Sequence, residues 1–188
     1  MKQNRGYDAT PDVSGMQRKM PVPDEMRWRI AANIAARIPL AYGMVFREVA
    51  GADYDRLEQQ IWVTLAYSVR EVAWTYSLPA GDSRELISAL EILNVIFFGP
   101  DFKSEQISFE HDRSVLLIRK CPFLIRQQEL SGPPDYAFNR CLAFSIALVE
   151  ELNPLYTLRF VRAMCQGDRN CEMKVMTRKD AEEAEKKG

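Results

Sequence analysis

Four cysteines are the residues of this chain whose type and placement most favour chemistry. Cys165 and Cys171 flank the turn-forming segment 167–170, and Cys121 and Cys141 precede them in the sequence. Four thiolates suit a tetrahedral Zn²⁺ site or an iron–sulfur cluster, because sulfur is a soft ligand. The spacing contains no Cys-x-x-Cys pair. It therefore leaves three alternatives open: a metal site, inert core thiols, or a reactive thiol.

The other polar candidates have weaker patterns. His111, the one histidine of the chain, is either a general base beside a thiol or a turn residue. Asp168 either orients a substrate or metal-bound water, or belongs to an ordinary Gly-Asp turn. Arg159 and Arg162 either bind a substrate carboxylate or face solvent from a strand. The sequence contains no readable Ser-His-Asp set, glycine-rich phosphate loop or helix-borne His-Glu motif.

Composition and charge limit the cellular compartments and the binding partners that we expect for this chain. Apolar residues make up 47% of the 188 residues, which is enough for a globular core. The net charge is -1 with scattered lysines and arginines, so nucleic acid is not an expected partner. Residues 1–23 lack the apolar run of a signal peptide, and no apolar run approaches the ~18 residues of a membrane span. We therefore expect a cytoplasmic protein that uses its cysteines as thiols or ligands rather than disulfides.

Three helices are predicted in the first half, after a flexible polar arm at residues 1–23. Ile30, Ile34 and Ile38 recur every four residues and indicate one apolar helix face, with a kink or break at Pro39. A second helix over residues 53–76 carries an apolar stripe of Leu57, Ile61, Leu65, Val69, Val72 and Tyr76. The third helix begins behind a capping arrangement of Asp82 and Glu85. One aromatic set either packs in the core or lines an apolar pocket: Trp62, Trp74, Phe97 and Phe98.

The second half changes to strand patterns. Residues 106–110 alternate and residues 114–120 are β-branched and aliphatic, which predicts a hairpin that turns at 111–113. A long helix over residues 135–152 carries Cys141 on its apolar face, and a second hairpin flanks Gly167-Asp168. We therefore expect an α+β domain over residues 24–177: N-terminal helices followed by an antiparallel sheet of hairpins packed on a long helix. Residues 178–188 form a charged tail.

This arrangement brings the cysteines together if both hairpins share one sheet and the long helix packs on it. Cys121 then ends a strand, Cys141 points from the helix toward the sheet, and Cys165 and Cys171 lie across from each other at the hairpin tip. If the four sulfurs meet, Cys121, Cys141, Cys165 and Cys171 offer a complete set of metal ligands for zinc, or for an iron–sulfur cluster as the alternative. The residues alone still leave inert core thiols and a reactive thiol open.

The C-terminal half resembles a known family. The strand that ends in Cys121-Pro122, then Cys141 and Leu152-Asn153-Pro154, and finally the Cys165–Cys171 hairpin follow the order of the L-2-amino-thiazoline-4-carboxylic acid hydrolase-like family. The resemblance covers roughly residues 84–177. The hairpin is also similar to the end of 4-vinyl reductase-like domains, which bind small molecules and in some cases hold zinc with nearby cysteines. Arg162 stands where the zinc-bearing sensor versions have an acidic ligand, so Cys121 is expected to replace it.

The resemblance implies two functions of different classes. The first is a small-molecule hydrolase that opens a cyclic amidine-like ring, through either a cysteine thiolate or a metal-activated water. The second is a non-catalytic binding or sensory domain with a structural cysteine-ligated metal. A small-molecule ligand or substrate is the expected partner in both, and the sequence leaves a homo-oligomer open. Four cysteine ligands would close a zinc site to water, so full ligation favours the second function.

Overall fold

The computed structural model describes residues 21–109, 112–133 and 135–186. Helices occupy the first half of the chain, and a helix–strand mixture follows. The elements are α1 (Asp24–Ala50), α2 (Ala52–Thr75), α3 (Ser83–Phe98), β1 (Lys103–Phe109), β2 (Arg113–Lys120), α4 (Pro122–Glu129), α5 (Asp135–Leu152), β3 (Tyr156–Arg162), the 3-10 helix η2 (Met164–Gln166), β4 (Cys171–Thr177) and α6 (Arg178–Glu185).

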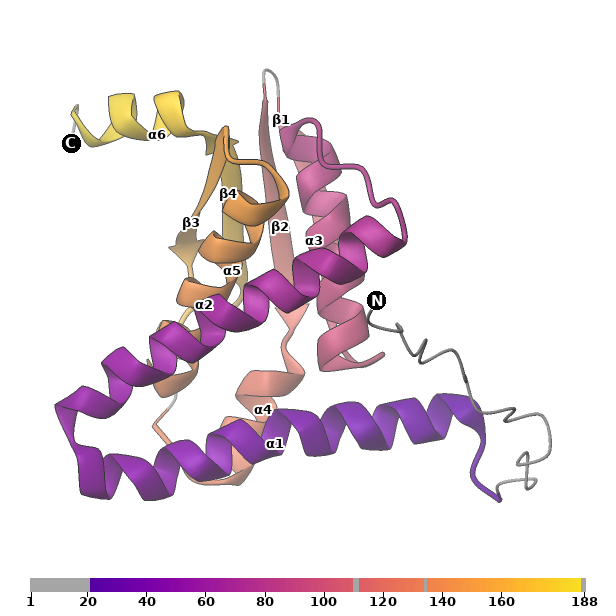
Figure 1. The fold of residues 1–188 in the computed structure, drawn as a ribbon, viewed down its shortest axis with the longest axis vertical. Helices are drawn as coiled ribbons and strands as arrows, with labels where there is room; N and C mark the ends of the chain where they lie inside the picture. The colour runs from indigo at the N-terminus through magenta and orange to yellow at the C-terminus, as the bar shows by residue number, and fades with distance from the viewer. Residues whose placement is uncertain (1–20, 110–111, 134, 187–188) are drawn as a thin grey trace, which may run out of the picture.

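A four-stranded antiparallel sheet in the order β1-β2-β4-β3 confirms the α+β prediction. The two hairpins lie side by side because β2 of the first pairs with β4 of the second. This pairing sets Cys171 opposite Ile118, just upstream of Cys121. Helices α3 and α5 lie against the sheet, and α2 crosses over α5 (Figure 1). The buried core lies between the sheet and these helices.

Helix α1 runs unbroken through Pro39, so the predicted break does not occur there. A proline inside a helix leaves the carbonyl four residues earlier without its usual donor. That carbonyl belongs to Ala35, an exposed residue, so water near it can replace the missing donor. The helix ends as expected at Gly51, whose φ of 56° suits glycine. From this corner α1 and α2 diverge (Figure 1).

The isoleucine stripe of α1, which the sequence predicts as one apolar helix face, faces outward. Ile34 is 54% exposed, and its neighbours in the stripe are similarly open. The residues that α1 does bury are mostly small: Ala32, Ala36, Leu40 and Gly43. Small side chains let the backbone of α1 approach the rest of the molecule closely, which explains why this face of the helix packs inward. No helix within the described ranges has the length and apolar character to cross a membrane.

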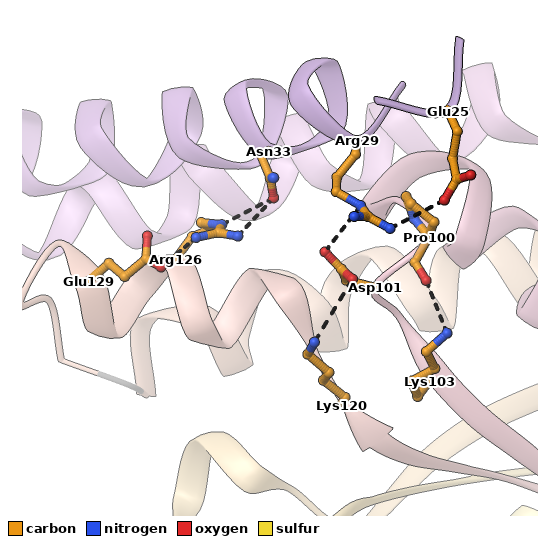
Figure 2. Close-up of polar contacts among 9 residues, drawn as sticks. All are labelled: Glu25, Arg29, Asn33, Pro100, Asp101, Lys103, Lys120, Arg126 and Glu129. Carbon is orange, nitrogen blue, oxygen red and sulfur yellow. Dashed lines mark hydrogen bonds and ion pairs between the residues drawn. The ribbon is translucent and has the colours of Figure 1, made fainter. Parts of the chain in front are cut away.

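Polar contacts attach α1 to the core at several points, as Figure 2 shows. Asn33 Oδ1 accepts hydrogen bonds from Arg126 of α4 at 2.9 and 3.2 Å. Arg29 lies 3.8 Å from Asp101, which also lies 3.9 Å from Lys120 at the end of β2. Because these contacts hold one side of α1, the helix keeps its place without burying its isoleucines.

The next two helices are partly as predicted. Asp82 accepts a hydrogen bond from the Glu85 N–H at 2.8 Å, and Glu85 accepts one from the Gly81 N–H at 2.7 Å, which confirms the capping arrangement. In α2 the predicted stripe is only half buried. Its centre packs inward at Val69, whereas Leu57, Ile61 and Tyr76 at its ends are exposed.

The orientation of α1 predicts a sharp difference between two aliphatic truncations. Leu40→Ala removes a fully buried side chain and should lower the free energy of unfolding by about 2–5 kcal/mol. Ile38→Ala, two positions earlier on the outward stripe, should change it by less than about 1 kcal/mol. Urea denaturation of both variants measures the difference. Equal losses would show that the isoleucine face is packed.

Candidate ligand groove and cysteine cavity

The four cysteines line one internal cavity. It has a volume of about 30 Å³ and lies between the sheet, α5 and the start of α4. Cys121 reaches it from the junction of β2 and α4, Cys141 from α5, Cys165 from η2 and Cys171 from the first position of β4. All four belong to the described residues, and no disulfide joins any two of them.

The hairpin tip places Cys165 and Cys171 on the same side, but not as two strand residues. Cys165 lies in the short helix η2, which Gly167 ends with a φ of 99°. Asp168 accepts a hydrogen bond from the Ala163 N–H at 2.8 Å and thereby closes the tip. The Met164 N–H donates to Cys171 Sγ at 3.3 Å. The tip is therefore a tight, internally bonded loop that holds both thiols toward the cavity.

Burial raises the pKa of three of these thiols. It raises the pKa of Cys121 to about 11. The Leu124 and Phe123 N–H groups at the start of α4 face its sulfur without making a capping hydrogen bond, and they only partly offset the rise. Burial, and then the proximity of the three other thiols, raises the pKa of Cys141 well above its usual range. Burial likewise raises the pKa of Cys171, and the Met164 N–H opposes it.

The donor types in this cavity fit a soft metal, but the ligands are not assembled. Four thiols around one space match the donor set of zinc or an iron–sulfur cluster. Among the described residues, however, no three or more His, Cys, Asp or Glu side chains are arranged to hold a metal ion. A metal would therefore need side-chain rotation and the loss of thiol protons on binding.

A larger apolar groove opens beside the cavity, between α1 and α2. Its volume is about 490 Å³, within the range of small-molecule sites. Exposed side chains of α1, including Tyr42 and Phe46, form its outer wall. The groove and the cavity share four aromatic residues: Trp62, Phe98, Phe123 and Phe144. These four aromatic residues therefore lie between the groove and the cavity that the thiols line.

The sequence left open whether the four predicted aromatic residues pack in the core or line an apolar pocket, and the structure shows both. Trp62 is buried and packs edge-to-face on Phe123 at 5.7 Å between ring centres. Phe98 lines both spaces, and Phe97 lines the groove. Trp74 is exposed, with the Arg70 guanidinium 4.3 Å from its ring centre. Three of the four residues therefore border a pocket, and Trp74 does not.

A buried ionic group at the boundary of the two spaces was missed by the sequence reading. Arg140 of α5 lines the cavity, and its Nε lies 2.7 Å from Oε1 of Glu58, which lines the groove. The Tyr54 hydroxyl donates to Glu58 Oε1 at 2.9 Å, and Arg47 Nη2 donates to Oε2 at 3.2 Å. Burial, followed by the bond to Glu58, raises the pKa of Tyr54 to about 12. These residues come from three helices, so no local spacing marks them.

The remaining predicted site residues lie away from the cavity and the groove. Asp168 is exposed and is used in the turn. Arg162 is exposed and lies 3.9 Å from Glu172. Arg159 is exposed on β3 beside an open surface depression. His111 lies outside the described residues. None of the three described candidates lines the space that the cysteines share.

The raised thiol pKa predicts a loss of stability at high pH. Between the ordinary value of 9.0 and the folded value of about 11, the unfolded chain releases the Cys121 proton while the folded chain keeps it. The free energy of unfolding therefore falls as pH rises through this window. Cys121→Ala should make this fall shallower than in the wild type. The tyrosines titrate in both proteins, so their contribution cancels when the two curves are compared. Chemical denaturation from pH 8 to 11 with a chelator present measures it, and parallel curves would contradict the buried thiol.

Comparison with known proteins gives the fold but no family. The sequence matches no protein-family model and no curated protein. The structure is similar to trafficking protein particle complex subunit 3 from Naegleria fowleri, solved covalently bound to palmitic acid, with a TM-score of 0.52 and 12% identity over 79% of this chain and 96% of that chain. It is also similar to the phenol-responsive sensory domain of the transcription activator PoxR, solved with phenol, with a TM-score of 0.52 and 10% identity over 73% of each chain. At these identities the likeness shows the fold alone.

Proposed function

We propose that this chain is a small-molecule-binding domain of sensory type, which takes an apolar ligand in the groove between α1 and α2. The observation that supports this most strongly is the groove itself. It is large enough for a small molecule, is walled by aromatic and aliphatic side chains, and has a few polar groups at one boundary. That composition is typical of ligand sites, where apolar walls supply affinity and few polar groups supply orientation.

The similar solved structures support the same class of function. One carries palmitic acid and the other phenol, so both ligands pair a largely apolar body with one polar end. A shared fold does not fix function, and the support here depends on the groove residues of this chain. The hydrolase prediction stays a prediction. The raised pKa of the Cys121 and Cys141 thiols and the turn-bound Asp168 favour binding over catalysis.

A blocked groove should abolish ligand binding. Ala35 is an exposed residue that lines the groove, so Ala35→Trp fills space there without disturbing the core. Isothermal titration with decan-1-ol and with phenol should give a Kd at least tenfold weaker for Ala35→Trp than for the wild type.

The matched control is Ala31→Trp, one turn earlier on the same helix and also exposed. It should leave the Kd unchanged. Failure of the wild type to bind either probe up to millimolar concentrations would contradict the proposed function. Equal weakening by both tryptophans would place the ligand elsewhere.

A second proposal concerns the cysteines: we infer that they bind a structural zinc ion that ties the hairpin tip to α5. Its support is the shared cavity and the Met164 N–H that already donates to Cys171 Sγ, as backbone groups do around metal thiolates. Cys121, Cys141, Cys165 and Cys171 would hold the ion. Four sulfur ligands leave no open position, so the metal would supply stability rather than activate water.

Cys141→Ala separates a metal ligand from a core thiol. As a ligand, Cys141 should carry the zinc-dependent part of folding, so the variant should lose bound zinc and the rise in Tm that zinc gives. As a core thiol, its removal should cost only about 1–2 kcal/mol. Zinc content and Tm of anaerobically purified protein, with and without chelator, measure both.

Ser145→Ala is the control, because Ser145 Oγ lies 3.9 Å from Cys141 Sγ and the change keeps every thiol. It should retain zinc. A metal-free wild type whose Tm ignores both added zinc and chelator would remove the metal proposal and leave buried thiols.

A further inference from the structure

Arg140 is an unusual residue for an apolar core. Its side chain is 1% exposed, although arginine is almost never fully buried without complete pairing. The backbone of α1 makes room for it at Gly43. A Cβ there would lie 2.3 Å from Arg140 Nη2 and 3.0 Å from the Tyr54 hydroxyl. The close approach of α1 therefore holds the guanidinium at the boundary of groove and cavity.

The guanidinium has donors that its partner does not use. Nε lies 2.7 Å from Glu58 Oε1, but its N–H is not aligned for a hydrogen bond, and Nη1 is buried without a partner among the described residues. Arg47 Nη1 is likewise buried and unpartnered. A buried donor without an acceptor is costly, so each such group in a folded protein needs an explanation, such as a bound water or ion that accepts its hydrogen bond.

The charges at this boundary favour an anion as that acceptor. Arg140, Arg47 and Glu58 have side-chain exposures of 1%, 9% and 6%, so two buried cations share one buried carboxylate. Arg47 also pairs with Asp55, but that carboxylate is 41% exposed and screened by solvent. A carboxylate accepts from a guanidinium with two oxygens and forms stronger hydrogen bonds than a neutral group.

We propose that the groove binds an apolar monocarboxylate, with the chain along α1 and α2 and the carboxylate accepting hydrogen bonds from Arg140. This inference rests on the proposed function and adds the chemical class of the ligand. Arg140 lines the cavity, and the cavity and the groove share the four aromatic residues Trp62, Phe98, Phe123 and Phe144. Glu58 lies beside the guanidinium, and the Tyr54 hydroxyl donates to Glu58. The site thus has an apolar body and one cationic end.

A matched pair of ligands tests the carboxylate without any mutation. Decanoate and decan-1-ol have the same carbon chain and differ at the head group. Isothermal titration of the wild-type protein at pH 7 should show decanoate binding at least about tenfold more tightly, since a hydrogen-bonded charge pair exceeds a neutral hydrogen bond by that much or more. Equal affinities, or tighter binding of the alcohol, would overturn the inference and leave the proposed function intact. Binding of neither ligand would overturn both.

Two variants locate the preference at Arg140. The double variant Arg140→Met with Glu58→Gln removes both charges together, because loss of Arg140 alone would leave a buried carboxylate. It should lose the preference for decanoate, so that the Kd values for decanoate and decan-1-ol become similar. Gly43→Ala keeps both charges but forces the guanidinium to move, and α1 tolerates alanine well. It should also reduce the preference.

Arg37→Met is the control, because Arg37 is half exposed on α1, pairs with Glu129 and does not line the groove. It should retain the preference. A preference for decanoate that survives in both the double variant and Gly43→Ala would overturn the role of Arg140. If the double variant does not fold, Gly43→Ala and the wild-type ligand pair still decide the question.

Discussion

The close contact of α1 with the rest of the molecule is the constraint on which this structure depends. Besides Leu40, the residues that α1 buries are the small Ala32, Ala36 and Gly43, so the backbone approaches closely while the isoleucines of α1 point away. Polar contacts such as Asn33 with Arg126 supply attachment that apolar burial does not. The result is a helix that stands at an angle to α2 and leaves an apolar groove between them. A helix packed through its isoleucines would have closed that space.

Helix α5 connects the two spaces through two adjacent residues on different faces. Cys141 lines the thiol cavity, and on the same side Phe138 packs edge-to-face on Phe160 of β3 at 5.4 Å. Arg140 also lines this cavity, and its guanidinium lies against Glu58 of α2 and the backbone of Gly43. A shift of this helix would therefore reach the cysteine cavity and the ionic boundary of the groove together. That coupling gives a physical route by which ligand binding in the groove would affect the sheet end of the molecule.

The sequence predicted the sheet because the hairpins have local patterns, and it left the meeting of the cysteines conditional on both hairpins sharing that sheet. Alternating residues define the hairpins, and Cys121-Pro122 and Gly167-Asp168 mark where strands end. The sequence predicted an apolar face on α1 but not that this face is exposed, because periodicity shows that a helix has two faces and does not say which one packs. Arg140 and Glu58 were missed for another reason: their pairing joins α5 to α2 and depends on the space above Gly43. Only the tertiary arrangement produces that space.

The position of a bound ligand would show most directly whether the space between α1 and α2 is a binding groove. A crystal structure of the protein with 10-bromodecan-1-ol would locate the bromine by its anomalous scattering. The bromine marks the end of the carbon chain, so this result does not depend on how the head group binds. The account predicts a bromine peak between α1 and α2, next to groove residues such as Pro39 and Ile61. A peak at another surface, such as the depression beside Arg159 on β3, with none between α1 and α2, would contradict it.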